Sequence, residues 1–125
     1  YVVDQLVNTL GSLEGLRVAV LGASYRGGVK ETAFSGVFPT VEALRAAGAD
    51  VVVQDPMYSD EELTKFGWAP YHLGESVDAV IVQADHAEYK TVAPTDFPGI
   101  KVLFDGRRIT NPQLWRGTPR HVIGE

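Results

Sequence analysis

The chain has 125 residues, a net charge of −5 and a hydrophobic fraction of 45%, which are ordinary values for one globular domain. It contains no cysteine, so this segment has no disulfide, no thiolate metal site and no cysteine nucleophile, a composition that fits a reducing compartment. The eleven Lys and Arg residues are scattered, which disfavours nucleic-acid binding, and no apolar run approaches the roughly 20 residues of a membrane-spanning helix.

An amphipathic helix is predicted at the start of the chain. Apolar residues recur there at helical spacing, at Val2, Val3, Leu6, Val7 and Leu10. Gly11 ends the pattern. We expect residues 1–11 to be the end of a helix that leads in from a preceding domain, and residues 12–125 to form the domain itself.

Strands and helices alternate along the rest of the chain. Short apolar runs rich in β-branched residues predict strands at residues 18–21, 51–53, 77–82 and 101–104, with a last edge strand at 121–123. A helix is predicted to begin between Ser35 and Pro39 and to stop at Gly48, and Ser59 is predicted to cap a short helix that ends at Gly67. This alternation predicts a Rossmann-like, three-layer α/β sandwich with a mostly parallel sheet of five to six strands.

Most polar residues of chemical interest follow the carboxyl ends of the predicted strands. Ligands of open α/β sheets bind beyond this edge, at the point where the strand order reverses. The stretches concerned are residues 22–33, 55–56, 84–86 and 105–108. We therefore expect a binding site at this edge of the sheet.

The loop after the first strand reads Gly22-Ala23-Ser24-Tyr25-Arg26-Gly27-Gly28. It departs from the dinucleotide pattern G-x-G-x-x-G because Ser24 stands at the second glycine, which disfavours a standard NAD site. Arg26 could grip a phosphate and Tyr25 could stack on a base, close to the start of the next helix. A flexible glycine loop with a surface Tyr-Arg pair is the alternative.

A second candidate stretch is Asp105-Gly106-Arg107-Arg108, at the end of the fourth predicted strand. Two consecutive arginines cannot both face one direction, so we expect at most one of them to reach a ligand. The other is expected to be solvated or paired with an acid, and Asp105 is expected to hold the turn.

Other conspicuous residues have plainer interpretations. Asp55 stands where a dinucleotide enzyme keeps its ribose-binding acid, but a turn-forming role is equally open without the glycine fingerprint. Asp85 and His86 provide too few ligands for a metal and are predicted to be a helix-capping pair in a short helix over residues 85–90. Trp68 and Trp115 are predicted to be packing or interface residues.

Four blocks of the chain together resemble one family. They are LRVAVLGASYRGGVKETAFSG, LRAAGADVVVQDPM, VDAVIVQADHAEY and KVLFDGRRI. In this order and at these intervals they resemble the C-terminal, UDP-binding domain of UDP-glucose/GDP-mannose dehydrogenases, over about residues 16–109.

The resemblance implies a division of labour. Enzymes of this family oxidise the C6 alcohol of a nucleotide-activated hexose, usually a UDP-sugar, to a carboxylate with NAD⁺. The N-terminal domain binds the NAD, and the central domain forms homodimers and contributes a catalytic cysteine. The C-terminal domain closes over the nucleotide of the substrate. The resemblance thus implies a cytoplasmic enzyme of polysaccharide biosynthesis, with no catalytic residue and no metal ligand in this segment.

The resemblance also implies particular contacts. Tyr25 and Arg26 match a Phe-Lys pair that lies against the nucleotide-sugar, and Arg108, or else Arg107, matches the arginine of the family's D-G-R motif. Gly22, Ser24, Gly27, Gly28, Asp55 and Asp105 are the supporting loop residues.

Three departures from the family pattern mark a divergent branch. Arg26 replaces a lysine, which changes a point charge into a planar fork. Lys30 and Glu31 replace an acidic pair, and Ala33 replaces an arginine that contacts the cofactor. Two functions therefore stay open: the substrate-binding domain of an NAD-dependent nucleotide-sugar dehydrogenase, or a non-catalytic Rossmann-like nucleotide-binding or sensor module.

Overall fold

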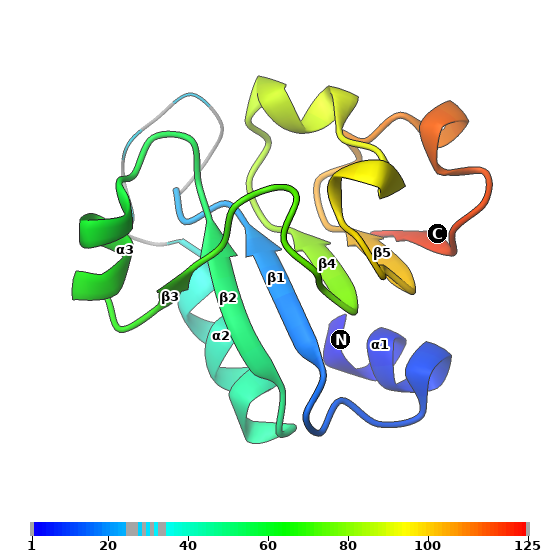
Figure 1. Cartoon of the computed structure of the whole chain (residues 1–125), viewed down its shortest axis with the longest axis horizontal. Coiled ribbons are helices and arrows are strands. Elements are labelled where there is room, and N and C mark those ends of the chain that lie inside the picture. Colours follow the sequence, from blue (N-terminus) through cyan, green and yellow to red (C-terminus); the bar gives the residue numbers. More distant parts are fainter. Residues whose placement is uncertain (1, 25–27, 29, 31, 33–34, 125) are drawn as a thin grey trace.

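The computed structural model describes residues 2–24, 28, 30, 32 and 35–124, and six parallel strands form one sheet within them (Figure 1). The strands are β1 (Arg17–Leu21), β2 (Asp50–Gln54), β3 (Ala69–Pro70), β4 (Ala79–Val82), β5 (Val102–Asp105) and β6 (Arg120–Val122). Their order across the sheet is β3-β2-β1-β4-β5-β6. The predicted Rossmann-like α/β class is confirmed.

One helix precedes β1, and further helices lie between most of the successive strands of the described part. They are the α-helices α1 (Val2–Leu10), α2 (Val37–Ala46) and α3 (Asp60–Lys65), and the 3₁₀ helices η1 (Ala87–Thr91), η2 (Pro94–Asp96) and η3 (Pro112–Trp115). The predicted cap of α3 is confirmed, because Ser59 and Glu62 bond to each other's backbone N–H in a capping box. Gly48 and Gly67 follow the ends of α2 and α3 with φ of 88° each, as their stop positions require.

Alternate residues of the four central strands β1, β2, β4 and β5 face different cores. In β1, Val18 and Val20 face the core that Leu6 of α1 and Leu44 of α2 share. Leu21 faces a second core, which is completed by aromatic and aliphatic residues of the 3₁₀ helices and their loops, among them Tyr89, Val92, Phe97 and Trp115. Because both faces are covered, the strands read as continuous apolar runs. The three-layer prediction is confirmed, and α2 lies behind β2 in the view of Figure 1.

Four elements differ from the sequence-based expectation: strand β3, the short helix after β4, and the 3₁₀ helices η2 and η3, which were not predicted. Strand β3 was not predicted, because two residues that include Pro70 carry no detectable periodicity. The short helix expected over residues 85–90 is the 3₁₀ helix η1, which begins at Ala87. Trp68 and Trp115 are 4% and 2% exposed, so their predicted packing role is confirmed.

Helix α1 packs on the sheet in the core that contains Val18 and Val20 of β1. Leu6 is fully buried, and the Thr9 hydroxyl lies 2.9 Å from Nε2 of His121 in β6.

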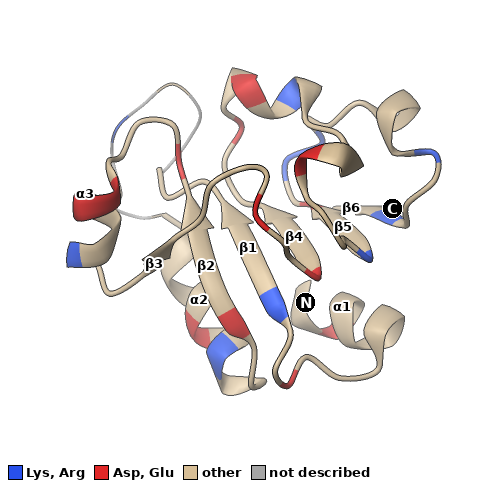
Figure 2. Cartoon of the chain, in the orientation of Figure 1, with Lys and Arg blue, Asp and Glu red and all other residues tan. Residues whose placement is uncertain are grey.

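Lys and Arg residues of the described part are dispersed among acidic ones (Figure 2). No helix in this part of the chain has the length and apolar character needed to cross a membrane.

Candidate nucleotide site at the switch point of the sheet

The order of the strands in the sheet reverses between β1 and β4. Strands β2 and β3 extend the sheet on one side, and β5 and β6 extend it on the other. The segments that leave β1, β2, β4 and β5 therefore meet at one edge, which is the position where open α/β sheets bind ligands. All four stretches that the sequence analysis selected begin at this edge.

Gly22 leads the chain out of β1 into a crowded turn. Its φ is 113°, and its N–H donates to the carbonyl oxygen of Gln54 at 2.6 Å. A Cβ atom at this position would lie 2.5 Å from the Cβ of Ala84, which follows β4. Only glycine satisfies both demands. The loop after β1 is thus wedged between the segments that follow β2 and β4.

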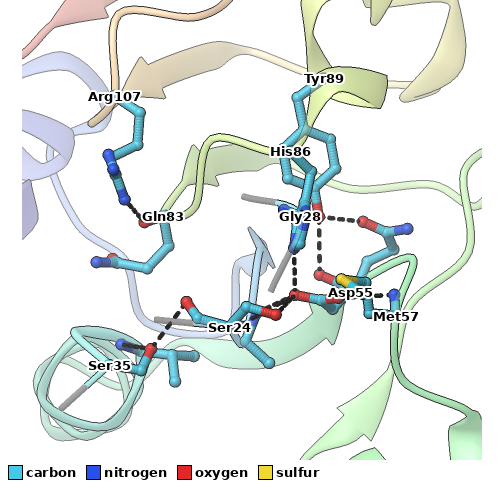
Figure 3. Close-up of polar contacts among 12 residues, drawn as sticks. Ser24, Gly28, Ser35, Asp55, Met57, Gln83, His86, Tyr89 and Arg107 are labelled. Carbon is cyan, nitrogen blue, oxygen red and sulfur yellow. Dashed lines mark hydrogen bonds and ion pairs between the residues drawn. The ribbon is translucent and has the colours of Figure 1, made fainter. Parts of the chain in front are cut away.

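Asp55 holds the start of this loop from the end of β2 (Figure 3). Its Oδ2 accepts hydrogen bonds from Ala23 N at 2.8 Å and from Ser24 N and Oγ at 3.1 Å each. The same oxygen lies 2.8 Å from His86 Nε2, and Oδ1 accepts from Met57 N at 2.8 Å. The carboxylate is fully buried. Asp55 is therefore a turn-forming and loop-holding acid, and it is not available to a ribose.

His86 is almost fully buried beside Asp55. The Gly28 N–H donates to its Nδ1 at 3.1 Å, so the ring proton must lie on Nε2, which donates to Asp55. The helix-capping prediction is wrong for this residue. His86 occupies the N-cap position of η1, but its side chain makes no capping bond because both ring nitrogens are engaged elsewhere. Asp85 pairs with Arg107 instead, at 3.3 Å.

Tyr89 completes the surroundings of His86. Its ring packs edge-on against the imidazole, with centroids 5.5 Å apart and an interplanar angle of 79°. Its hydroxyl donates to Gln54 Oε1 at 2.7 Å. Burial raises the pKa of Tyr89 far above its ordinary value, so the hydroxyl stays protonated and acts as a donor.

Asp105 organises the second candidate stretch. Its Oδ1 accepts from Arg107 N at 3.0 Å, and its Oδ2 accepts from Thr110 N at 2.7 Å and from Thr110 Oγ1 at 2.5 Å. The side chain is fully buried. Arg120 supports the arrangement by donating from Nε to Thr110 Oγ1 at 2.9 Å. The expectation that Asp105 holds the turn is confirmed.

Arg107 and Arg108 point in different directions, as expected for consecutive residues. Arg107 Nη1 lies 3.5 Å from the carbonyl oxygen of Gln83, at the switch point. Arg108 Nε donates to the carbonyl oxygen of Ile123 at 3.0 Å, beyond β6. The backbone of Arg108 has φ of 54°, which turns this residue away from its predecessor. The structure therefore brings Arg107, and not Arg108, to the loop after β4.

Gln83 occupies the centre of the edge, and the sequence analysis did not select it. Its Oε1 accepts from the Thr40 hydroxyl of α2 at 2.8 Å, and its carbonyl oxygen faces Arg107. Its position directly after β4, at the reversal of strand order, is the signal that could have identified it. Figure 3 shows Gln83 between Arg107 on one side and the Ser24 and Ser35 segments on the other.

Tyr25, Arg26 and Gly27 lie outside the described residues, as do Glu31 and Ala33. Residues on either side of them make defined contacts. Ser35 Oγ donates to the carbonyl oxygen of Ser24 at 3.3 Å, and Lys30 Nζ lies 2.6 Å from a carboxylate oxygen of Glu62 in α3. The loop is thus tied to α3 through Lys30 and to its own beginning through Ser35.

A parallel sheet with two polar loops and an arginine at its switch point defines an open α/β domain of the Rossmann class, which binds its ligands at this edge. The family model described as "UDP-glucose/GDP-mannose dehydrogenase family, UDP binding domain" matches residues 19–112. The chain belongs to this family, and the resemblance stated from its four sequence blocks is confirmed.

Curated relatives agree with this assignment. A UDP-N-acetyl-D-mannosamine dehydrogenase of Methanococcus vannielii is 28% identical over 93% of this chain and 29% of its own length. The UDP-glucose 6-dehydrogenase AglM of Haloferax volcanii is 32% identical over 78% of this chain and 24% of its own length. The chain therefore spans less than a third of the length of these relatives.

Solved structures show the same fold. A UDP-D-ManNAc dehydrogenase from Pyrococcus horikoshii superposes with a TM-score of 0.74 and 23% identity, over 98% of this chain and 29% of that one. A UDP-glucose dehydrogenase from Pyrobaculum islandicum superposes with a TM-score of 0.74 and 24% identity, over 95% of this chain and 28% of that one. The fold of this chain is therefore shared with part of each of these larger enzymes.

Proposed function

We propose that this domain binds the nucleotide part of a UDP-sugar within an NAD-dependent nucleotide-sugar 6-dehydrogenase. The proposal is carried by the meeting of two family blocks at one edge of the sheet, where Arg107 reaches the carbonyl oxygen of Gln83. It is supported by the family description as a UDP binding domain and by the names of the relatives. The enzyme as a whole would oxidise the sugar C6 alcohol to a carboxylate.

Within the site we assign two kinds of role. Tyr25 and Arg26 are proposed as direct contacts of the base and phosphates, from their match to the family's motif, and Arg107 as the arginine that reaches the same ligand. A guanidinium can bind a phosphate through two parallel hydrogen bonds. Asp55 and Asp105 are buried and saturated with protein hydrogen bonds, so they hold the loops and do not touch the ligand.

The residues of this domain do not fit NAD. The loop after β1 lacks the second glycine of a dinucleotide turn, and the acid after β2 is buried in hydrogen bonds to that loop. We therefore assign NAD and the hydride transfer to other domains of a longer, homodimeric, cytoplasmic enzyme. This domain would contribute binding energy and help to exclude water when it closes over the substrate.

Nucleotide titration of the ¹⁵N-labelled chain tests the proposal. UDP, and a UDP-sugar more strongly, should shift the amide signals of residues 22–28 and 105–108, and adenosine diphosphate serves as the control nucleotide. Affinity is expected to be weak, because other domains would complete the pocket. If both loops stay unmoved at millimolar UDP while another nucleotide moves them, the UDP assignment is wrong.

A non-catalytic nucleotide-binding or sensor module is the second candidate. It is favoured by Lys30, which stands where the family has an acid and which pairs with Glu62, and by Ala33 in place of the family's arginine. Such a module would bind UDP in the same titration. NADH formation by the full-length protein with a panel of UDP-sugars separates the two candidates, since only the enzyme reduces NAD⁺.

A further inference from the structure

We propose that His86 is the positioning residue of the nucleotide-binding loop. One imidazole tautomer, selected by Asp55, accepts the Gly28 N–H and so fixes the far end of the segment that carries Tyr25 and Arg26 in the sequence. The consequence for ligand affinity rests on the proposed function, whereas the effect on the loop does not.

The contacts of His86 join three segments that are distant in sequence. The ring follows β4, receives the Gly28 N–H from the loop after β1 and donates to Asp55 after β2. It is 1% exposed, so both nitrogens are shielded from bulk solvent. The His86–Asp55 contact is 2.8 Å long and fully buried. A solvated surface histidine would lack this directional constraint.

Asp55 determines which nitrogen carries the proton. Its Oδ2 is also the acceptor for Ala23 N, Ser24 N and Ser24 Oγ, so this oxygen faces only donors. A carboxylate in this position requires Nε2–H from the imidazole and leaves the Nδ1 lone pair for Gly28. The polarity of the His86–Gly28 bond is therefore a consequence of the buried carboxylate.

The pair holds the loop at two points. Asp55 binds the backbone of Ala23 and Ser24, and His86 binds the backbone of Gly28. Residues 25–27 lie between these anchors in the sequence. Backbone groups that are already held in position lose less conformational freedom on binding, and this raises affinity without any contact between His86 and the ligand.

Two matched substitutions separate the two bonds of the ring. In His86→Asn, the amide oxygen can take the place of Nδ1 and accept from Gly28, while the bond to Asp55 is lost. In His86→Gln, the amide NH₂ can take the place of Nε2 and donate to Asp55, while the acceptor for Gly28 is lost. Both variants lose the packing of the imidazole against Tyr89, so each is the control of the other.

We expect His86→Gln to weaken UDP binding by about fivefold, the effect of losing one neutral hydrogen bond, and His86→Asn to stay within about twofold of the wild type. Isothermal titration calorimetry measures the affinities, and thermal unfolding should show a similar loss of Tm in both variants. Equal UDP affinities in the wild type and both variants would overturn the proposal. An equal loss of UDP affinity in the two variants would also overturn it, because only His86→Gln removes the acceptor for Gly28.

A ligand-free measurement keeps the two proposals apart. Long-range ¹H–¹⁵N spectra of the wild type should show His86 protonated at Nε2 alone, and the Gly28 amide should exchange with solvent faster in His86→Gln than in His86→Asn. Protonation at Nδ1, or equal exchange in both variants, would contradict the role of His86 even if UDP binds. Absence of UDP binding together with the expected tautomer and exchange pattern would reject only the nucleotide assignment.

Discussion

Gly22 and Ala84 approach each other so closely that a Cβ on Gly22 would lie 2.5 Å from the Cβ of Ala84 and 2.6 Å from its backbone nitrogen. The contact joins the ends of β1 and β4, the two strands between which the order of the sheet reverses. Neither of these two Ala84 atoms can move away without shifting the backbone after β4, the segment that contains Gln83 and His86. Only glycine therefore fits at position 22, where the segments after β1 and β4 meet.

Gly22→Ala should be strongly destabilising for this reason. Gly74 provides a matched control, since its φ of 101° is equally unsuited to alanine but its Cβ would meet nothing within 4 Å. We expect Gly22→Ala to lower the free energy of unfolding by about 1–3 kcal/mol more than Gly74→Ala, the usual cost of overpacking. Urea denaturation measures the difference. Equal losses in the two variants would show that backbone strain alone is responsible.

Asp55→Asn should destabilise the domain although it preserves the shape of the side chain. In either orientation the amide NH₂ faces N–H donors, because Ala23 and Ser24 donate to one carboxylate oxygen and Met57 donates to the other. We expect a loss of about 1–3 kcal/mol, as for a buried hydrogen-bonding group left unsatisfied. Asp60→Asn, at an exposed side chain, is the control and should change stability by less than about 1 kcal/mol. A smaller loss for Asp55→Asn than for Asp60→Asn would contradict this account.

Arg107→Ala and Arg108→Ala should differ in their effect on UDP binding. Arg107 lies at the switch point, whereas Arg108 binds the carbonyl oxygen of Ile123. Loss of a charge-assisted hydrogen bond to a phosphate corresponds to about tenfold or more in affinity. We expect this loss for Arg107→Ala and an unchanged affinity for Arg108→Ala in calorimetric titrations. The opposite order would restore Arg108 as the ligand-binding arginine of the family motif.

His72 should give the domain a small pH-dependent step in stability. Hydrogen bonds to Glu75 and then to Asp60 raise the pKa of His72 above its ordinary value. A raised folded-state pKa means that the contribution is fully present below the unfolded pKa of about 6.5 and is lost as pH rises through the folded pKa. Because the side chain is exposed, the step should be less than about 1 kcal/mol.

NMR titration of the His72 ring protons measures this pKa, and urea denaturation on both sides of the transition measures the step. His72→Gln is the control, because it keeps a hydrogen-bonding side chain but removes the titrating group. A step of the same size in His72→Gln would assign it to another residue.

The sequence by itself determined the class of fold, the family and the edge of the sheet at which we propose the site. Strands covered on both faces must be apolar along their whole length, so β1 and β2 could be recognised from local sequence alone. The cap Ser59 and the stop Gly48 are also local, since each acts through neighbouring backbone groups. Tyr25 and Arg26 stay predictions drawn from the family resemblance.

Only the tertiary structure decided how the polar residues at that edge are used. His86 and Asp55 are 31 residues apart, and they meet because β1 pairs with β2 on one side and with β4 on the other. A local interpretation therefore made His86 a helix cap, although its partners come from two other segments. The choice between Arg107 and Arg108 likewise depends on the left-handed backbone at Arg108 and on its contact with Ile123, which follows β6. Such contacts are set by the packing of strands distant in sequence, which local sequence patterns do not encode.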